Sequence, residues 1–555
     1  MFFSYALYLG LVLCGLGLLY KLAWWFSARV GDAAQGLGPA RRVGAALGGL
    51  LRALASPRLR PMLGGLVLDG FFQRRSLAHS RLAWAGHMLM FWGFLLLLLM
   101  HALEKQISAR LFSDYAATLN PYLPLRDLFG IMVAAGVGIT IYRRAKEPVL
   151  KRTTRAVDRL AIAILAVIIL SGFALGALKI TSQQRFQAMV KEYSTLDKAE
   201  EVQALEAYWA RDFGVVFGQG EAPPRDEVWE KGRQLHESEC AQCHDRPQWA
   251  AASYGLSRLL KPAALFLNRK DVDTALWYVH FLACFIGLAL LPWTKFLHLF
   301  TSPLLLMARA AGDLRGMRPA NQATLRAFMI DACTHCGACS VHCSVAVAVG
   351  QTANLDILPS EKLNGLRRLA QGRLQGPEAE RLREGSYVCT LCHRCTRLCP
   401  VGIDLQELWF ALNQDLARRG LGPAYLATRE LASGAAEESR GRGLVKVEPS
   451  RVRPALISSA LAATFTNCYR CLTCSNVCPV VRFYPEPMKR LDLLPHQIMH
   501  SLGLGLMEEA MGARMTWSCL TCYHCQEACP QGVRVTDVLY ELRNLAAAQA
   551  RAGRI

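Results

Sequence analysis

The sequence has 555 residues, of which 52% are apolar, and it carries a formal net charge of +20 at pH 7. This apolar fraction is high for a soluble protein and indicates a membrane part. The basic residues concentrate beside apolar stretches, as in the cytoplasmic loops of membrane proteins, so the charge does not indicate nucleic-acid binding. Most of the 20 cysteines stand at metal-ligand spacing, which excludes a disulfide framework and favours a reducing compartment.

Five apolar stretches are each near the ~20 residues that a helix needs to cross a bilayer. They run over roughly residues 3–25, 82–103, 126–142, 159–179 and 274–297. The first stretch has no basic residues before it and no clear cleavage site after it, so we expect an uncleaved anchor.

The arginines between the spans predict the topology. Residues 26–81 and 143–155 are rich in arginine and lysine, which places both loops in the cytoplasm. The N-terminus and the loops 104–125 and 180–273 are then outside, and everything after the fifth span is cytoplasmic. We expect a multi-pass protein of a bacterial inner membrane.

The long outer loop contains Cys240-Ala-Gln-Cys243-His244. C-x-x-C-H is the attachment motif of a c-type haem, so Cys240 and Cys243 are expected to form the thioethers and His244 to ligate the iron. The preceding segment resembles the opening helix of a small cytochrome c. The sixth ligand stays open between Met189 and His236. The alternative is a C-x-x-C redox pair beside an incidental histidine.

The second and fifth spans each contain two histidines near opposite ends. Ionisable residues inside membranes are rare and usually functional. Because these spans run in opposite directions, His87 should face His298 on the cytoplasmic side, and His101 should face His280 on the outer side. This arrangement predicts two b-type haems, each held by two histidines. His79 is the alternative to His87.

These features resemble the cytochrome b (gamma) subunit of respiratory nitrate reductase. The resemblance covers about residues 1–300 and implies a five-helix bundle with haem ligands on the second and fifth helices. The outer loop 180–273 departs from this pattern.

The remaining part of the chain repeats one pattern, C-x2-C-x2-C-x3-C, four times. The runs are Cys333, Cys336, Cys339, Cys343; Cys389, Cys392, Cys395, Cys399; Cys468, Cys471, Cys474, Cys478; and Cys519, Cys522, Cys525, Cys529. This is the run of bacterial two-cluster ferredoxins, in which the fourth cysteine of each run ligates the other [4Fe–4S] cluster. Zinc sites use paired C-x2-C and lack this third cysteine.

Cross-ligation predicts four ligand sets. They are Cys333, Cys336, Cys339 with Cys399; Cys389, Cys392, Cys395 with Cys343; Cys468, Cys471, Cys474 with Cys529; and Cys519, Cys522, Cys525 with Cys478. Proline follows every run except the first, which has Ser344.

The runs form an internal duplication. We expect one two-cluster module over residues 325–420, a linker over 421–455 and a second module over 456–555. Helical periodicity between the runs, without strand patterns, predicts α-helical ferredoxin domains. The chain as a whole is expected to be all-α.

The fourth run, in TWSCLTCYHCQEACPQGVRVTDVLYELRN, resembles the small iron–sulfur subunit of heterodisulfide reductase. The second run resembles the iron–sulfur domain of larger reductase-like subunits. Their Cys-Cys-Gly motif, which the resemblance associates with disulfide reduction, is missing here. No G-x-G-x-x-G nucleotide fingerprint occurs either.

Together these features predict a membrane electron-transfer subunit of a respiratory oxidoreductase, with its substrate site on partner subunits. We expect a flavoprotein or reductase subunit in the cytoplasm and, outside, a cytochrome c or a hydrogenase. The alternative is a menaquinol/menaquinone oxidoreductase subunit with the haem c as a side branch. A redox sensor is a weaker alternative, because no signalling domain is recognisable.

Overall fold

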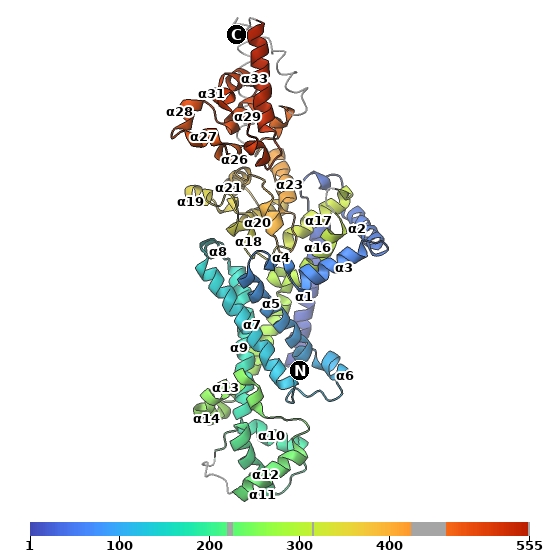
Figure 1. Cartoon of the computed structure of the whole chain (residues 1–555). Coiled ribbons are helices and arrows are strands. Elements are labelled where there is room, and N and C mark those ends of the chain that lie inside the picture. Colours follow the sequence, from blue (N-terminus) through green and yellow to red (C-terminus); the bar gives the residue numbers. More distant parts are fainter. Residues whose placement is uncertain (219–225, 313–315, 423–461, 553–555) are drawn as a thin grey trace. The chain divides into compact units, whose positions relative to one another are not determined.

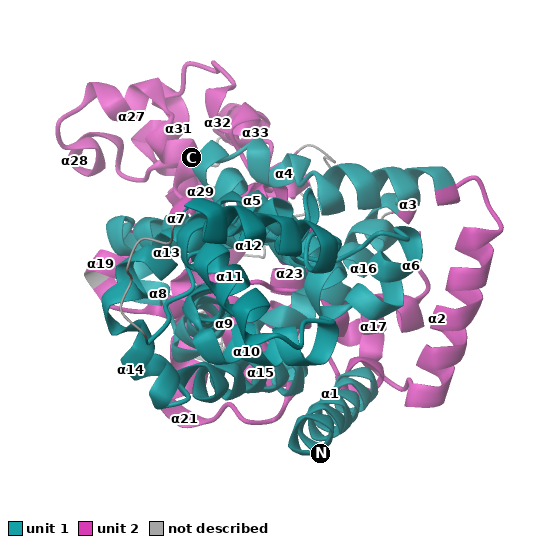
Figure 2. Cartoon of the chain, turned by 90° about the horizontal axis from the view of Figure 1, so that it is seen from below, with its two compact units in different colours: residues 1–23, 60–310 teal, residues 24–59, 311–555 magenta. Residues whose placement is uncertain are grey.

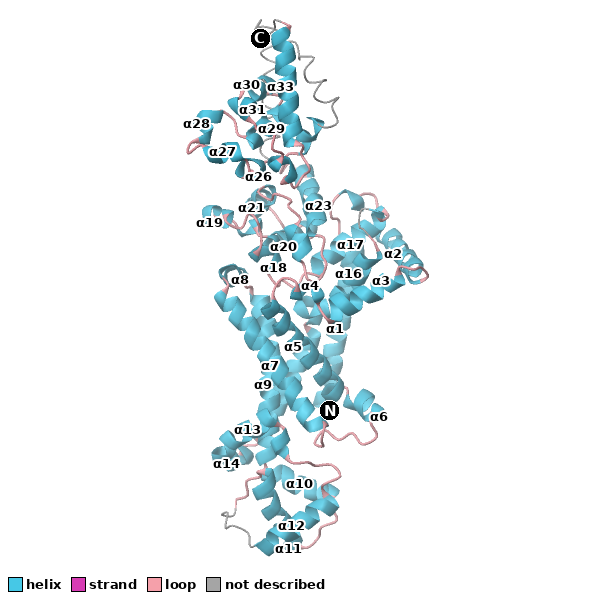
Figure 3. Ribbon diagram, in the orientation of Figure 1, coloured by secondary structure: helices cyan, strands magenta, loops and turns pink. Residues whose placement is uncertain are grey.

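The computed structural model of the chain describes residues 1–218, 226–312, 316–422 and 462–552. These residues form helices joined by loops, and their one β-type pairing is an isolated bridge between Ser182 and Val216 (Figure 3). The predicted all-α architecture is confirmed.

The chain divides into two compact units (Figure 2). Unit 1 holds residues 1–23 and 60–310, and unit 2 holds residues 24–59 and 311–555. Residues 24–59 therefore group with the iron–sulfur half, although the sequence placed the boundary near residue 300. From residue 423 onward, the predicted linker 421–455 lies outside the described residues.

Among the described residues, five helices are long and apolar enough to cross a membrane, and most of them belong to unit 1 (Figure 1). They are α1 (Phe2–Ser27), α5 (Arg81–Leu97) continued by the π-turn η3 (Leu98–Ala102), α7 (Tyr122–Lys146), α9 (Ala156–Thr181) and α15 (Val272–Ala289). These helices confirm the five predicted spans, apart from the end of the fifth.

The fifth span differs from the prediction at its end. One helix was expected over 274–297, but α15 ends at Ala289. Two 3-10 turns follow, η8 (Leu291–Trp293) and η9 (Lys295–Leu297), before α16 (His298–Ala311). Pro292 explains the break, because proline has no N–H for the helix ladder and its ring clashes with the preceding turn.

Glycines allow the membrane helices to approach closely. Gly86 of α5 faces Gly136 of α7, and a Cβ on Gly136 would lie 2.5 Å from the Gly86 carbonyl oxygen. Small residues are the usual contact between membrane helices, since lipid provides no hydrophobic drive for their association.

The described residues between α9 and α15 form helices of their own. They are α10 (Gln183–Tyr193), α11 (Ala199–Tyr208), the π-turn η5 (Trp209–Phe213), α12 (Asp226–Glu239), α13 (Ala251–Leu260) and α14 (Ala264–Arg269). The buried Asp127 of α7 accepts hydrogen bonds from the backbone N–H of Ala252 (2.7 Å) and Ser253 (3.2 Å) at the start of α13. This carboxylate caps α13 and ties the outer region to the bundle.

Unit 2 includes α2 (Pro39–Leu54) and the first iron–sulfur module. The module contains α17 (Pro319–Asp331), α18 (Ala338–Val341), α20 (Pro359–Ala370), α21 (Gly376–Tyr387), α22 (Arg394–Leu398) and α23 (Leu405–Arg418). Arg42 of α2 is buried and donates hydrogen bonds to the carbonyls of Trp25 (2.7 Å) and Ala28 (2.6 Å). It thereby satisfies acceptors that the end of α1 leaves open.

The second module has a hydrophobic core of its own. Its helices are α26 (Thr473–Asn476), α27 (Pro479–Phe483), α28 (Pro487–Leu491), α29 (Pro495–Leu504), α30 (Met507–Gly512), α31 (Arg514–Ser518), α32 (His524–Glu527) and α33 (Val535–Arg551). Buried Ile498, Met515, Val538 and Leu542 belong to this core.

Candidate cofactor sites

The four cysteine runs share an unusual backbone turn. In each run, the second and fourth residues after the first cysteine have positive φ, between 50° and 78°. They are His335 and Gly337, Leu391 and His393, Arg470 and Leu472, and Thr521 and Tyr523. Non-glycine residues rarely adopt this conformation, and it costs free energy that folded proteins retain mainly at functional sites. Such turns direct successive N–H groups toward one centre, which suits an anionic iron–sulfur cluster.

One cavity in the first module is lined by cysteines from two runs. Cys333, Cys336 and Cys339 come from the first run and Cys399 from the end of the second. The backbone N–H of Ile403 donates to Cys399 Sγ at 3.3 Å. These four thiols are the first predicted ligand set, and their arrangement supports cross-ligation.

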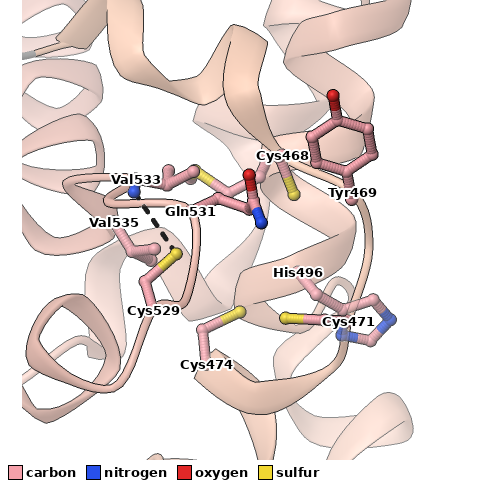
Figure 4. A pocket seen from close by; sticks show the side chains of 10 residues that line it. Cys468, Tyr469, Cys471, Cys474, His496, Cys529, Gln531, Val533 and Val535 are labelled. Carbon is pink, nitrogen blue, oxygen red and sulfur yellow. Dashed lines mark hydrogen bonds between the residues drawn. The ribbon is translucent and has the colours of Figure 1, made fainter. Parts of the chain in front are cut away.

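The second module repeats this arrangement (Figure 4). Cys468, Cys471, Cys474 and Cys529 line a cavity, and the N–H of Val533 donates to Cys529 Sγ at 3.3 Å. Their sulfur atoms turn toward a common space in Figure 4. This is the third predicted set, again drawn from two runs.

The remaining two sets also bring cysteines of different runs near one another. Burial raises the pKa of Cys525, and the neighbouring thiols Cys519 and Cys478 raise it further. In the first module, burial raises the pKa of Cys343, and Cys389 of the next run acts in the same direction. Both relationships join the fourth cysteine of one run to the other run.

Ser344, the residue that replaces proline after the first run, has a contact of its own. Its Oγ lies 3.3 Å from Cys392 Sγ and 3.2 Å from Thr390 Oγ1. The departure from the run pattern therefore adds a hydroxyl beside one of the predicted ligands. A hydrogen bond to a ligand sulfur is one of the features that set cluster potentials.

The membrane histidines meet in the two predicted pairs. The ring centroids of His87 and His298 are 5.9 Å apart, and those of His101 and His280 are 6.2 Å apart. Two imidazoles on opposite sides of one metal, with bonds of about 2 Å, would have centroids roughly 6 Å apart. The spacing therefore fits two residues that share one iron.

Nδ1 of both His280 and His298 has a polar partner. Ser171 Oγ lies 3.0 Å from Nδ1 of His280, and Nδ1 of His298 contacts the carbonyl oxygen of Lys295. Histidines that bind metals usually use one nitrogen for the metal and the other for such a partner. Nδ1 of His87 is buried and has no hydrogen-bond partner among the described residues.

The structure separates the two candidates for the inner pair. His79 is exposed and precedes α5, whereas His87 lies within α5 and faces His298. The expectation that His280 and His298 lie on one helix was wrong. His298 begins α16 after the break at Pro292 and does not share a helix with His280, yet the pair forms.

In the outer region, the C-x-x-C-H residues lie beside an aromatic cluster. Cys240 is buried, Cys243 is exposed, and the His244 ring lies 5.5 Å from Trp209. His236 is buried, with its ring 5.7 Å from Trp209. Burial lowers the pKa of His236 to about 4, so its imidazole is neutral at neutral pH.

Both candidates for the sixth haem ligand lie close to this cluster. Met189 packs against the apolar core that includes Trp209 and Cys240, and Nδ1 of His236 has no hydrogen-bond partner among the described residues. α12 and α11 approach so closely that a Cβ on Gly232 would lie 2.0 Å from the Ala204 carbonyl oxygen. This close contact fixes the position of α12, which leads into the C-x-x-C-H motif.

Sequence reasoning missed the residues that orient the predicted ligands. Ser171 lies on the fourth span, which has no histidine and was expected only to pack. A serine within an apolar span is a weak signal, because such hydroxyls commonly bond to the backbone of their own helix. Trp209 and Phe213 gave no signal either, since aromatic residues usually serve as core.

Comparisons with known proteins match different families to the membrane region and to the two cysteine-rich modules. Residues 73–198 match the model of the nitrate reductase gamma subunit, and residues 329–403 and 464–533 match that of the 4Fe-4S dicluster domain. The chain joins a nitrate reductase gamma-like membrane region to heterodisulfide reductase-like ferredoxin modules. The match to the gamma subunit ends before Cys240.

Three curated relatives are components of heterodisulfide reductases. An iron–sulfur subunit of CoB–CoM heterodisulfide reductase from Methanopyrus kandleri is 41% identical over 80 residues, which are 14% of this chain and 38% of the relative. A subunit of the H2:CoB–CoM heterodisulfide,ferredoxin reductase from Methanothermobacter marburgensis is 35% identical over 91 residues, 16% of this chain and 45% of the relative. A subunit of the dihydromethanophenazine:CoB–CoM heterodisulfide reductase from Methanosarcina mazei is 31% identical over 115 residues, 19% of this chain and 28% of the relative.

The chain thus spans less than half the length of each of these relatives. No solved structure matches it.

Proposed function

We propose that this chain is the membrane-bound electron-transfer subunit of a heterodisulfide reductase-like redox complex. The observation that carries the proposal is the presence, on one chain, of two facing histidine pairs and four cysteine turns in ferredoxin modules. One histidine pair lies on two membrane spans, and the other joins α5 to the start of α16. Such ligands hold groups that accept and release single electrons.

In this proposal, each part of the chain binds a cofactor. His87 with His298 and His101 with His280 would each hold a b-type haem by both axial positions. Ser171 and the Lys295 carbonyl would fix the orientation of the rings on the fifth-span side. The sixteen cysteines of the four runs would hold four [4Fe–4S] clusters in the cross-ligated sets.

The outer region would hold a c-type haem through Cys240, Cys243 and His244. The buried aromatic residues around Trp209 would keep water away from the iron ligands. The arginine-rich loops favour an orientation with this region on the periplasmic side and the ferredoxin modules in the cytoplasm. Electrons would then pass between a donor or acceptor outside and a partner subunit inside.

The chain itself would catalyse no bond change. Because its relatives are subunits of heterodisulfide reductases, we expect a cytoplasmic reductase or flavoprotein partner that carries the substrate site. On the outer side, the exposed Cys243 edge of the C-x-x-C-H motif suits exchange with a soluble cytochrome or a hydrogenase.

Iron analysis of the purified chain tests the assigned haem and cluster ligands. The assigned ligands require about 19 iron atoms per chain: sixteen in clusters, two in b-type haem and one in covalently attached haem. Covalent haem should vanish in Cys243→Ala and persist in Cys284→Ala, a cysteine outside all the motifs. Covalent haem in Cys243→Ala at the wild-type level would contradict the outer site.

Electron transfer is tested with the chain in sealed vesicles. A reduced cytochrome that cannot cross the membrane, added on the side of the outer loop, should reduce the clusters. A variant carrying Cys243→Ala and His244→Ala should lose this reduction, and Cys284→Ala should keep it. Undiminished reduction would overturn the proposed route. Reduction of the variant by a menaquinol analogue would show that electrons also enter at the b-type haems.

A further inference from the structure

The first iron–sulfur module contains a buried lysine. Lys362, in α20, is 1% exposed, and its Nζ lies 5.1 Å from the ring centroid of the equally buried Trp409. The adjacent Glu361 pairs with His335 instead. Among the described residues, no carboxylate forms an ion pair with Lys362. A buried ammonium group is costly unless a negative charge compensates it, and the indole face compensates only part of that cost.

The groups beside Lys362 that can supply a negative charge are cysteine thiols, which become thiolates when they bind iron. Burial raises the pKa of the Cys395 thiol to about 12, and the charge of Lys362 acts to lower it. Lys362 acts in the same direction on Cys343, whose pKa burial also raises. Cys395 and Cys343 come from different runs and belong to the same predicted cluster. The lysine therefore lies beside that cluster.

The duplication provides an internal comparison for this residue. α20 and α29 both begin with Leu-Pro at their N-terminal ends. In the first module the N–H of Ser360 donates to Ser340 Oγ at 3.1 Å, and in the second the N–H of His496 donates to Ser475 Oγ at 3.2 Å. The same hydrogen bond thus joins equivalent helices to equivalent runs.

This equivalence pairs Lys362 with an apolar residue. Counting from the helix-starting prolines, Lys362 corresponds to Ile498, which is 0% exposed. Counting from the last cysteines of the second and fourth runs, Trp409 corresponds to Leu539, which is 1% exposed. The second module therefore fills the place of the lysine–tryptophan pair with two hydrocarbon side chains.

We propose that Lys362, positioned by Trp409, is the counter-charge of the cluster held by Cys343, Cys389, Cys392 and Cys395, and that it makes this cluster easier to reduce than its counterpart in the second module. The proposal rests on the cluster assignment of the proposed function. Four thiolates give the cluster a net negative charge, which grows by one when it accepts an electron. A fixed positive charge nearby stabilises the reduced form more than the oxidised form.

The two modules would then differ in electron occupancy. Reduction adds one electron, taken from the external reductant, and breaks no bond, while Lys362 keeps its proton throughout. As the potential of the solution is lowered, the cluster beside Lys362 would be reduced before the cluster beside Ile498. The equivalent clusters of the two modules would thus differ in reduction potential.

Electron paramagnetic resonance titration of the full-length, cluster-loaded chain tests this. Lys362→Met should lower the reduced-to-oxidised ratio of one cluster by about tenfold at fixed poise, which corresponds to about 59 mV for one electron. The signal that shifts should be the one absent from Cys389→Ala. Lys362→Arg, which keeps the charge, should stay within about threefold of wild type, and the other three clusters should not shift.

A double variant guards against loss of the fold. Lys362→Ile with Trp409→Leu copies the pair that the second module already accommodates, so the cluster should assemble, and its reduced-to-oxidised ratio should fall by at least the tenfold expected for Lys362→Met. Four intact clusters with unchanged potentials in this variant would overturn the role of Lys362 alone. Absence of [4Fe–4S] signals from the wild-type chain would instead overturn the proposed function on which it rests.

Discussion

His101 and His280, on the second and fifth membrane spans, face each other with ring centroids 6.2 Å apart. Two spans that run in opposite directions bring these residues together from far apart in the sequence. If they share one iron, replacing either should remove the same haem.

His280→Ala is therefore expected to lower the b-type haem content from two to one per chain. His101→Ala should give the same loss, and the double variant should lose no more than either single variant. His79→Ala, which removes an exposed histidine outside the pairs, should retain both haems. Pyridine haemochrome assays of the purified chain would measure the b-type haem content. Loss of both haems from the double variant alone would show that the residues act at separate sites.

Ser171→Ala removes the hydroxyl 3.0 Å from Nδ1 of His280. The imidazole then loses one of the partners that fix its orientation, and such partners change metal affinity by roughly 10- to 100-fold. We expect the outer b-type haem to dissociate more readily and its potential to shift, while the inner haem is unaffected. Thr140→Ala, a hydroxyl bonded to its own helix at Gly136, is the matched control. Equal haem retention and equal potentials in both variants would contradict a positioning role for Ser171.

The sequence predicted most of this arrangement because its strongest signals are periodic or closely spaced. Span length follows from apolar runs, and each cysteine run follows from local spacing. What escaped prediction depends on contacts between distant segments. Ser171 is recognisable only once α9 packs beside His280. Lys362 looks like an ordinary charged residue of an amphipathic helix until burial and Trp409 are known.

The helix break before His298 escaped prediction for a different reason. Pro292 was visible in the sequence, but the apolar residues around it continued the pattern of a membrane span. Hydropathy measures how apolar a segment is and does not register the missing N–H of a proline. The grouping of residues 24–59 with unit 2 also required structure, because it depends on buried contacts such as Arg42 with the end of α1.

Cross-ligation makes a prediction for pairs of cysteine variants. Cys333 and Cys399 belong to one predicted cluster, so Cys333→Ala with Cys399→Ala should remove about four non-haem irons, like either single variant. Cys333→Ala with Cys343→Ala should remove about eight, because these residues serve different clusters. Ligation within each run would give the opposite pattern. Iron and acid-labile sulfide assays distinguish the two schemes.

Cluster assembly should depend on pH in a defined direction. Burial raises the pKa of both the Cys395 and Cys399 thiols to about 12, so both are protonated in the cluster-free fold at neutral pH. Clusters bind thiolates, so assembly must release these protons. Cluster affinity should therefore rise with pH below about 12, by up to tenfold per pH unit for each proton released.

Competition with an iron chelator at pH 7 and pH 8.5 measures this dependence in the full chain. Cluster retention should be greater at pH 8.5, after correction for the protonation of the chelator. The same retention at both values would show that these thiols are already ionised before iron binds.

If a c-type haem is attached at Cys240 and Cys243, its sixth ligand would be one of two residues near the same aromatic cluster. His236 is buried and neutral, with an unpaired Nδ1 among the described residues, whereas Met189 packs at the edge of the core. A neutral imidazole can bind iron directly, and the buried position of His236 needs a partner to offset its desolvation. We therefore expect His236→Ala to convert the haem c iron from low spin to high spin and Met189→Ala to leave it low spin. Magnetic circular dichroism of the oxidised chain separates the outcomes, since bis-histidine and histidine–methionine haems differ in their charge-transfer bands. A low-spin haem in His236→Ala together with a high-spin haem in Met189→Ala would assign the ligand to the methionine.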